Sequence, residues 1–208
     1  MKPVAIINCT GGNVRSVLNA FSIIGTNPYL VRDKKDLETA ELIVLPGVGS
    51  FKTGMLGLNS SGLIPHLKNQ IYNEQKPLLG ICLGMQLLCN SSEENESIHG
   101  LGWVDAKVEK LKPPKSGYPL PHVGWDDVNW SNDSFLRPQK RPISSCFYFV
   151  HSYGVLEKPV GAHVECTTDY GQTIISGFRR KNIYGVQFHP EKSQDEGLEV
   201  LDQWISVT

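Results

Sequence analysis

The sequence has no long hydrophobic run and no excess of one charge. None of its apolar stretches approaches the roughly 20 residues that a membrane-spanning helix needs. The apolar part of Met1–Asn8 is too short for a secretory signal, and it predicts a first strand instead. The formal net charge of the 208 residues is −1, which indicates neither a nucleic acid nor an anionic membrane as partner. We therefore expect a cytoplasmic protein with no nucleic-acid or membrane partner.

Cysteine pairs and cofactor motifs are missing as well. The five cysteines form no C-x-x-C pair and show no metal-ligand spacing, so neither disulfides nor a zinc site are expected. No G-x-G-x-x-G follows the first strand, and there is no phosphate loop. The sequence thus predicts no metal and no cofactor, in a reducing compartment where a reactive thiol can persist. The cysteines are Cys9, Cys82, Cys89, Cys146 and Cys166.

The amino-acid mix is that of a globular chain, with 40% hydrophobic and 20% charged residues. We expect residues 1–208 to form a single domain. In its first part, apolar runs alternate with helical patterns, which predicts βαβ units and a doubly wound, mostly parallel sheet flanked by helices. The expected elements there are strands at Val4–Asn8, Tyr29–Arg32 and Glu41–Leu45, a helix from Asn13 to about Ile24, a short helix capped by Asp33, and a helix over Ser61–Glu74.

The sequence pattern changes after Cys89, where shorter segments alternate between apolar and polar residues with period 2. These segments predict a small additional antiparallel portion of the sheet. The chain ends in a helical pattern in which Ser193 and Glu196 have the spacing of a capping box. The expected strands are Val104–Lys110, Cys146–His151, Val160–Thr168, Gln172–Phe178 and Ile183–Phe188.

The most informative stretch is Gly80-Ile81-Cys82-Leu83-Gly84, which follows a short apolar run. A G-x-C-x-G between a strand and a helix is the thiol form of the nucleophile elbow, in which a tight turn exposes one side chain above the sheet. The turn also puts Cys82 at a helix N-terminus, which favours a thiolate. The alternative interpretation is a buried core cysteine.

Two further segments end at the same edge of the predicted sheet. Pro46–Phe51 follows the third strand, and ligands in open α/β sheets lie beyond the carboxyl ends of strands. Taken alone, this loop is more simply a plain Pro-Gly turn. His189 and Glu191 follow the last strand, and two residues apart in an extended chain they share a face. A thiol, an imidazole and a carboxylate are the parts of a nucleophile, base and orienting group, although His189 alone could be an ordinary buried histidine.

These motifs resemble a known family. Gly80–Gln86 together with Gln187–Ser193 is similar to the class I glutamine amidotransferases, flavodoxin-like glutaminases with a Cys-His-Glu triad. The segments Leu45–Phe51, His122–Trp125 and Tyr148–Tyr153 resemble, more narrowly, the glutaminase subunit of imidazole glycerol phosphate synthase. That subunit docks on a (β/α)₈-barrel cyclase, to which it delivers ammonia.

The resemblance implies a role for each matching residue. Cys82 would attack the side-chain amide of L-glutamine and form a thioester, with His189 as base and acid and Glu191 orienting it. The oxyanion hole would use the N–H of Leu83 and that of Val48 or Gly49, in a loop that supplies or withholds its donor. The substrate's amino-acid end would be held by Gly47, Gln86, Glu94, Ser152 and Tyr153.

The resemblance also places the partner interface at Asn13, Gly124, Trp125 and Asp126. Trp125 could equally be a half-buried strand residue. The match is weakest in Asn8–Asn13 and at Asp126, where the family normally has Asn. Three interpretations therefore remain open: a glutaminase of histidine biosynthesis, a paralogue that feeds a synthase of surface-polysaccharide sugars, or a non-catalytic relative that binds a partner. We expect the isolated subunit to be a slow glutaminase, because the donor loop could be unproductive until docking.

Overall fold

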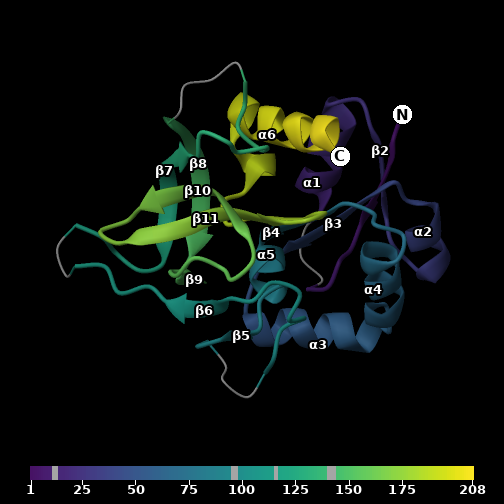
Figure 1. Ribbon diagram of the computed structural model, residues 1–208, viewed down its shortest axis with the longest axis horizontal. Coiled ribbons are helices and arrows are strands. Elements are labelled where there is room, and N and C mark those ends of the chain that lie inside the picture. The colour runs from purple at the N-terminus through teal and green to yellow at the C-terminus, as the bar shows by residue number, and fades with distance from the viewer. Residues whose placement is uncertain (11–13, 95–97, 115–116, 140–143) are drawn as a thin grey trace.

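The computed structural model describes residues 1–10, 14–94, 98–114, 117–139 and 144–208 (Figure 1). Within these ranges twelve strands form one sheet, and its main path has the order β2-β1-β3-β4-β12-β11-β10-β7-β8. The strands are β1 (Pro3–Ile6), β2 (Asn27–Leu30), β3 (Leu42–Gly47), β4 (Leu78–Cys82), β5 (Ser91–Ser92), β6 (Lys107–Lys110), β7 (His122–Trp130), β8 (Ser144–His151), β9 (Tyr153–Val155), β10 (His163–Asp169), β11 (Thr173–Arg180) and β12 (Ile183–Val186).

The first half of the sheet is parallel, as the alternating pattern predicts. Strand β1 pairs with β2 and β3, β3 pairs with β4, and β4 pairs with β12, each in parallel register. Gly47 lies opposite Cys82 in the β3–β4 register, and Val186 lies opposite Ile81 in the β12–β4 register. The carboxyl ends of β3, β4 and β12 therefore meet at one edge of the sheet.

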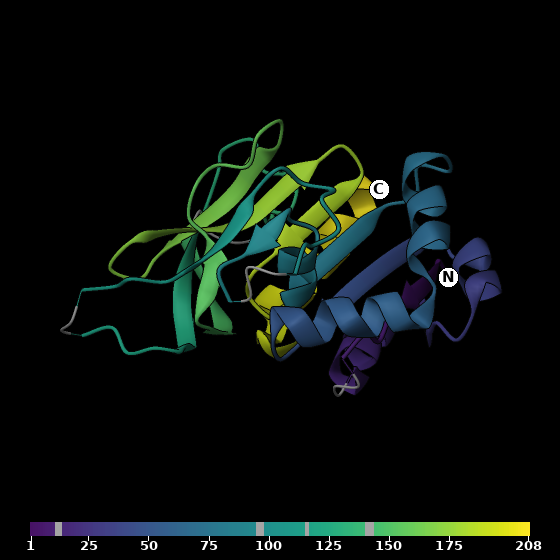
Figure 2. The ribbon, with the colours of Figure 1, turned by 90° about the horizontal axis from the view of Figure 1, so that it is seen from below.

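Helices cover both faces of this parallel half (Figures 1 and 2). On one face, the buried residues of α1 and α6 pack together with Val4, Ile6 and Val44 of the sheet. On the other face, α2, α3, α4 and α5 share a core with Ala5, Ile43 and Leu45. The helices are α1 (Arg15–Ile23), α2 (Lys34–Thr39), α3 (Phe51–Ser61), α4 (Ile64–Tyr72), α5 (Leu83–Leu87) and α6 (Gln194–Val207), with a 3₁₀ turn η1 (Pro190–Lys192) before α6.

The second half of the sheet is antiparallel and continues the first without a break. Strand β11 pairs antiparallel with β12 and β10, β10 with β7, and β7 with β8. Strand β9 pairs with β11 and β6, and β5 pairs with β6, so these three strands branch from the main path. The predicted antiparallel portion is confirmed, and it includes β7, which was not among the strands expected from the sequence.

Helix α3 is the largest element that was not predicted from the sequence. Ser50 caps it by accepting a hydrogen bond from the Thr53 N–H at 3.2 Å, and Gly62 ends it in a left-handed conformation. The helix expected over Ser61–Glu74 is correspondingly shorter and begins at Ile64.

The predicted capping box at the start of α6 is wrong. The hydroxyl of Ser193 makes no cap hydrogen bond to its own helix. It instead donates to the carbonyl of His189 at 2.7 Å and accepts from the N–H of Tyr148 at 3.0 Å. Ser193 thus ties the segment after β12 to β8.

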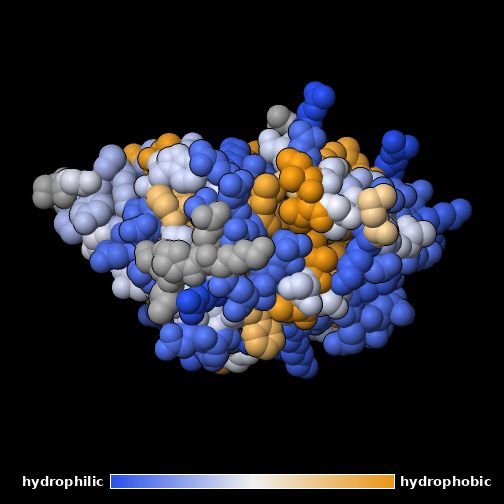
Figure 3. Space-filling model, turned by 90° about the horizontal axis from the view of Figure 1, so that it is seen from above, coloured by the Kyte–Doolittle hydropathy of each residue, from blue (hydrophilic) through white to orange (hydrophobic). Residues whose placement is uncertain are grey.

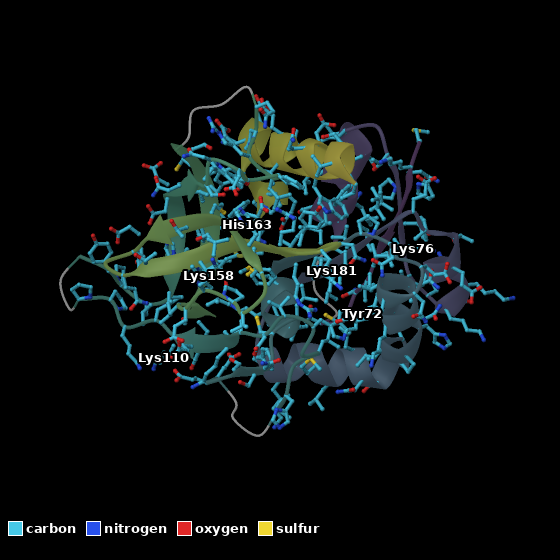
Figure 4. The ribbon with its side chains drawn as sticks, in the orientation of Figure 1. Tyr72, Lys76, Lys110, Lys158, His163 and Lys181 are labelled. Carbon is cyan, nitrogen blue, oxygen red and sulfur yellow. The ribbon has the colours of Figure 1, made fainter. Side chains whose placement is uncertain are left out.

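Short polar contacts fix the outer helices. Asp33 caps α2, as the sequence predicts, and the structure adds a capping box with Asp36. Lys76 lies on the side of the molecule that carries α2 and α4 (Figure 4), and its ammonium donates to the carbonyls of Leu37 and Glu38 in the last turn of α2. Burial lowers the pKa of this ammonium, while the charges of Glu74 and Glu38 act in the opposite direction.

The face that carries α1 and α6 has a strip of hydrophobic side chains among hydrophilic ones (Figure 3). Ile23, at the end of α1, is 70% exposed.

Among the residues that the structure describes, none belongs to a helix that is both long and apolar enough to cross a bilayer.

Candidate active site

The strand-to-helix turn at Cys82 has the geometry of a nucleophile elbow. Cys82 is the last residue of β4 and the residue before α5, with φ 51° and ψ −110°. A positive φ at a non-glycine residue costs on the order of 1–3 kcal/mol and is concentrated at functional sites. The turn can close because Gly80 has no side chain: a Cβ there would lie 2.8 Å from the backbone nitrogen of Met85. Gly84 lets α5 approach β3, since a Cβ there would lie 1.6 Å from the Leu45 carbonyl oxygen.

Cys82 lines a cavity of about 290 Å³ above the carboxyl ends of the strands. The elements around it come from distant parts of the sequence: the loop after β3, helix α5, the end of β8 and the segment after β12. Most of the predicted site residues share its wall, namely Val48, Gly49, Cys82, Leu83, Gln86, Glu94, Ser152, Tyr153 and His189. Three further residues of the wall were not predicted: Pro121, Val150 and His151.

His189 and Glu191 form a buried pair beside the sulfur. The Nδ1 atom of His189 is 2.8 Å from Oε1 of Glu191, and the His189 side chain is 2% exposed. The expected reason for this contact, an extended chain with period 2, is wrong. Glu191 lies in the 3₁₀ turn η1, which folds its carboxylate back onto the imidazole. The backbone of His189 is held by β8, because its N–H donates to the Tyr148 carbonyl at 2.9 Å.

The surroundings of His189 favour its cation. Burial lowers the pKa of the imidazole, but the charge and hydrogen bonding of Cys82, followed by the hydrogen bond and charge of Glu191, together raise it to about 10. Although Cys82 contributes to this shift, Nε2 of His189 has no hydrogen-bond partner of normal geometry in the described part of the chain. Nε2 of His189 is therefore available to a ligand in the cavity.

The predicted substrate contacts have different surroundings. The amide nitrogen of Gln86 donates to the Tyr153 carbonyl at 2.8 Å and to Oε1 of Gln187 at 3.0 Å. One carboxylate oxygen of Glu94 accepts the Phe51 N–H at 2.6 Å, at the start of α3. Gly47 does not line the main cavity; it lines a smaller one of about 20 Å³, next to His189 and Glu191.

The predicted partner residues lie on β7, except Asn13, which is outside the described residues. The indole of Trp125 is 48% exposed and meets the ring of Tyr148 edge-on, with centroids 6.1 Å apart. Asp126 belongs to the opposite face of the strand, since its Oδ2 is 3.3 Å from Nε2 of His122, which is buried. The geometry therefore separates Asp126 from the surface of Trp125.

The interior polar groups behind the cavity were not predicted either. Gln187 is fully buried, and its amide nitrogen lies 3.6 Å from Sγ of Cys82. The rings of His122 and His151 are joined by a 3.1 Å contact between Nδ1 and Nε2. In the sequence, the signal that could have marked Gln187 as a site residue is its polar side chain between the apolar Val186 and Phe188. Among the residues described, no three His, Cys, Asp or Glu side chains converge so that they could hold a metal ion.

Sequence comparison places this geometry in a family. The family model described as “Glutamine amidotransferase class-I” matches residues 5–206. The chain belongs to the class-I glutamine amidotransferases. Curated relatives cover nearly its whole length. It is 42% identical over 202 residues to “Imidazole glycerol phosphate synthase subunit HisH 2” of Methanococcus maripaludis, covering 97% of this chain and 98% of the relative. It is 39% identical over 204 residues to “Imidazole glycerol phosphate synthase subunit HisH” of Methanothermobacter thermautotrophicus, covering 98% of each.

Solved structures agree on the fold. A structure described as a glutamine amidotransferase has a TM-score of 0.76 at 18% identity, with 99% of each chain covered. One described as PurLQS from Thermotoga maritima has a TM-score of 0.72 at 20% identity, covering 99% of this chain and 98% of the other. The predicted flavodoxin-like α/β class of this amidotransferase is thereby confirmed.

Proposed function

We propose that this chain hydrolyses L-glutamine to glutamate and ammonia with Cys82, His189 and Glu191, and that it supplies the ammonia for imidazole glycerol phosphate formation in histidine biosynthesis. The observation that carries the proposal is the meeting of a strained, cavity-lining cysteine with a buried His-Glu pair in a chain of this family. The names of the full-length relatives support the histidine pathway.

In the first half of the reaction, the thiolate of Cys82 attacks the side-chain amide carbon of glutamine and forms a C–S bond. The imidazolium of His189, favoured by its raised pKa, then gives its proton to the leaving nitrogen as the C–N bond breaks. Ammonia departs and a glutamyl thioester remains on Cys82. Glu191 holds Nδ1 of His189, so that Nε2 carries the transferred proton.

In the second half, neutral His189 takes a proton from water, and the resulting hydroxide attacks the thioester carbon. The C–S bond breaks, glutamate is released, and the thiolate of Cys82 and the imidazolium of His189 are regenerated. All atoms come from glutamine and one water, so the reaction needs no metal or cofactor.

The negative oxygen of both tetrahedral intermediates needs donors, which we assign to the N–H groups of Leu83 and of Val48 or Gly49 on the cavity wall. Each preorganised donor of this kind is worth roughly 2.7–4 kcal/mol in barrier height. One carboxylate oxygen of Glu94 accepts the Phe51 N–H, and we assign the other oxygen to the substrate ammonium. Gln86, Ser152 and Tyr153 line the same end of the cavity.

The ammonia acceptor belongs to a second chain in this proposal. We assign the partner as a (β/α)₈-barrel cyclase that docks on the exposed face of β7, where Val123 and Trp125 are 53% and 48% exposed. Aromatic side chains are the usual anchors of such contacts. We also propose that residues 1–208 act as one domain, in the cytoplasm, where the five cysteines stay reduced.

The test compares glutamine-dependent and ammonium-dependent synthesis in the complex with the cyclase. Replacing Cys82→Ala removes the nucleophile, so glutamine hydrolysis is lost, while synthesis from an ammonium salt continues. Cys146→Ala, at an exposed cysteine on β8, is the matched control and keeps both activities when the cyclase is saturating. Glutamine hydrolysis that survives in Cys82→Ala would contradict the proposal, and failure of the wild-type complex to make imidazole glycerol phosphate would contradict the acceptor.

A further inference from the structure

Buried polar groups lead away from the sulfur of Cys82, and two of them, Gln187 and His151, have no role in the reaction described above. It begins at Gln187, whose amide nitrogen donates toward Sγ of Cys82 at 3.6 Å. Sulfur accepts weakly as a thiol and better as a thiolate, because a hydrogen bond to a charged acceptor is the stronger kind. The position of Gln187 beside the nucleophile therefore matters when the sulfur is charged.

The neighbouring amide fixes which way Gln187 faces. The amide nitrogen of Gln86 donates one hydrogen to the Tyr153 carbonyl and the other to Oε1 of Gln187. With its oxygen held by Gln86, Gln187 can present only its NH₂ group to the sulfur. In the flipped orientation, NH₂ would face NH₂ and the amide oxygen would face a thiolate, so both contacts would be repulsive.

The hydrogen bonds of His151 and His122 determine which of their ring nitrogens carry hydrogen. The Tyr153 carbonyl can only accept, so Nδ1 of His151, 2.9 Å away, must carry a hydrogen. Nε2 of His151 then accepts from Nδ1 of His122 at 3.1 Å, while the other ring nitrogen of His122, Nε2, faces Oδ2 of Asp126 at 3.3 Å. Burial lowers the pKa of His151 to about 3, which keeps this tautomer neutral. His122 itself is stacked on the rings of Phe149 and Tyr170, with centroids 4.7 and 3.9 Å away.

We propose that Gln187 is a catalytic residue that stabilises the Cys82 thiolate through its N–H, and that His151 is a positioning residue that holds the Tyr153 carbonyl against Gln86. The same N–H serves twice in the reaction, since the sulfur is a thiolate both before attack and after the thioester breaks. The proposal rests on the proposed function in naming the sulfur as nucleophile, but its test reads the proton on the sulfur directly.

The experiment measures the rate at which iodoacetamide alkylates Cys82 in the full chain as a function of pH. Mass spectrometry of the Cys82 peptide separates it from the other four thiols. In Gln187→Met the thiolate loses one hydrogen-bond donor, so the midpoint of the alkylation profile moves up by about one pH unit. Gln70→Met is the matched control, because Gln70 is a buried glutamine on α4 outside the cavity, and its midpoint stays at the wild-type value.

A second variant covers the case in which Gln187→Met does not fold. Gln86→Leu leaves Gln187 in place but removes the N–H that holds its Oε1, so Gln187 is free to turn its oxygen toward the sulfur and the midpoint rises in the same direction. Circular dichroism shows which variants are folded. A wild-type midpoint in a folded Gln187→Met or Gln86→Leu, or an equal shift in Gln70→Met, overturns the role of Gln187.

The role of His151 has its own pair of variants. His151→Leu removes the donor to the Tyr153 carbonyl and raises the midpoint, whereas His151→Asn keeps an N–H at the place of Nδ1 and restores most of the wild-type profile. Equal profiles in the two variants overturn the positioning role. Because the assay uses neither glutamine nor a partner, a shifted midpoint in a chain without glutaminase activity would count against the proposed function alone.

Discussion

At the scale of single residues, the pair of His189 and Glu191 makes stability depend on pH. The pKa of His189 is raised from 6.5 to about 10, partly by the hydrogen bond and charge of Glu191. A pKa that is higher in the folded than in the unfolded state contributes stability that is fully present below the unfolded value and is lost as pH rises through the folded value. Glu191→Gln removes part of this contribution. The stability difference between wild type and variant should therefore be largest near pH 6.5 and shrink as pH approaches 10.

Urea unfolding of both proteins at a series of pH values between 6.5 and 10 measures this difference. Glu41→Gln, at an exposed glutamate before β3, is the control and should follow the wild type throughout. A difference between wild type and Glu191→Gln that stays constant, or that grows with pH, would contradict the role of Glu191 in holding the proton on His189.

The sequence predicted residues better when they stand in a local motif than when they are brought in by the fold. The G-x-C-x-G around Cys82 and the His-x-Glu at Glu191 are local, and both motifs lead to the same cavity. Gln187 and His151 become visible as site residues only once β12 and β8 bring them to the ends of β4 and α5. The contact of Glu191 with His189 was predicted for the wrong reason, because a 3₁₀ turn after a strand has no period-2 signature.

At the scale of elements, the packing of α5 on β3 depends on the absence of a side chain at Gly84. Its ideal Cβ would lie 1.6 Å from the Leu45 carbonyl oxygen, a backbone atom that cannot move aside without displacing β3. Gly84→Ala should therefore lower the free energy of unfolding by several kcal/mol, about 3 or more, as expected of an overpacked core. It should also lower the alkylation rate of Cys82, because the elbow moves with α5.

Gly161→Ala separates this steric effect from the general cost of replacing a glycine. Gly161 has φ +68°, and no atom lies within 4 Å of its ideal Cβ, so alanine there costs only the left-handed conformation, about 1 kcal/mol. Chemical denaturation of both variants gives the comparison. If Gly84→Ala were no less stable than Gly161→Ala, the close approach of α5 to β3 would not be a requirement of the fold.

Among the elements, those with clear periodicity were predicted, and those with weak periodicity were not. Helix α3 contains Gly54 and Gly57, which lower its helix propensity, so its caps at Ser50 and Gly62 were the better signal. At the other end of the chain, the Ser193–Glu196 spacing indicated a cap that does not form, because the fold gives the Ser193 hydroxyl to His189 and Tyr148 instead. A tertiary contact next to the site therefore overrides the local pattern that predicted Ser193 as a helix cap.

At the scale of the whole molecule, the continuous sheet connects the exposed face of β7 with the cavity. Trp125 lies opposite Tyr148 in the β7–β8 register, and the Tyr148 carbonyl accepts the N–H of His189. Strand β8 also contributes Val150 and His151 to the cavity wall. A chain that docks on β7 is therefore one strand away from β8, whose Tyr148 carbonyl holds the backbone of His189. Neither this pairing nor the order of β10, β7 and β8 could be predicted, because strand order depends on long-range contacts.

Trp125 is the expected anchor for docking on that surface. Trp125→Ala removes a half-exposed indole, so it should change the melting temperature of the isolated chain by little, yet weaken binding of the cyclase by about 30-fold, as for a central interface residue worth about 2 kcal/mol. Leu56→Ala is the control, because Leu56 is 49% exposed on α3, away from β7. Titration of each variant with cyclase gives the dissociation constants. Saturating cyclase should restore glutamine hydrolysis in Trp125→Ala, since its cavity is intact, and an unchanged dissociation constant would show that the partner docks elsewhere.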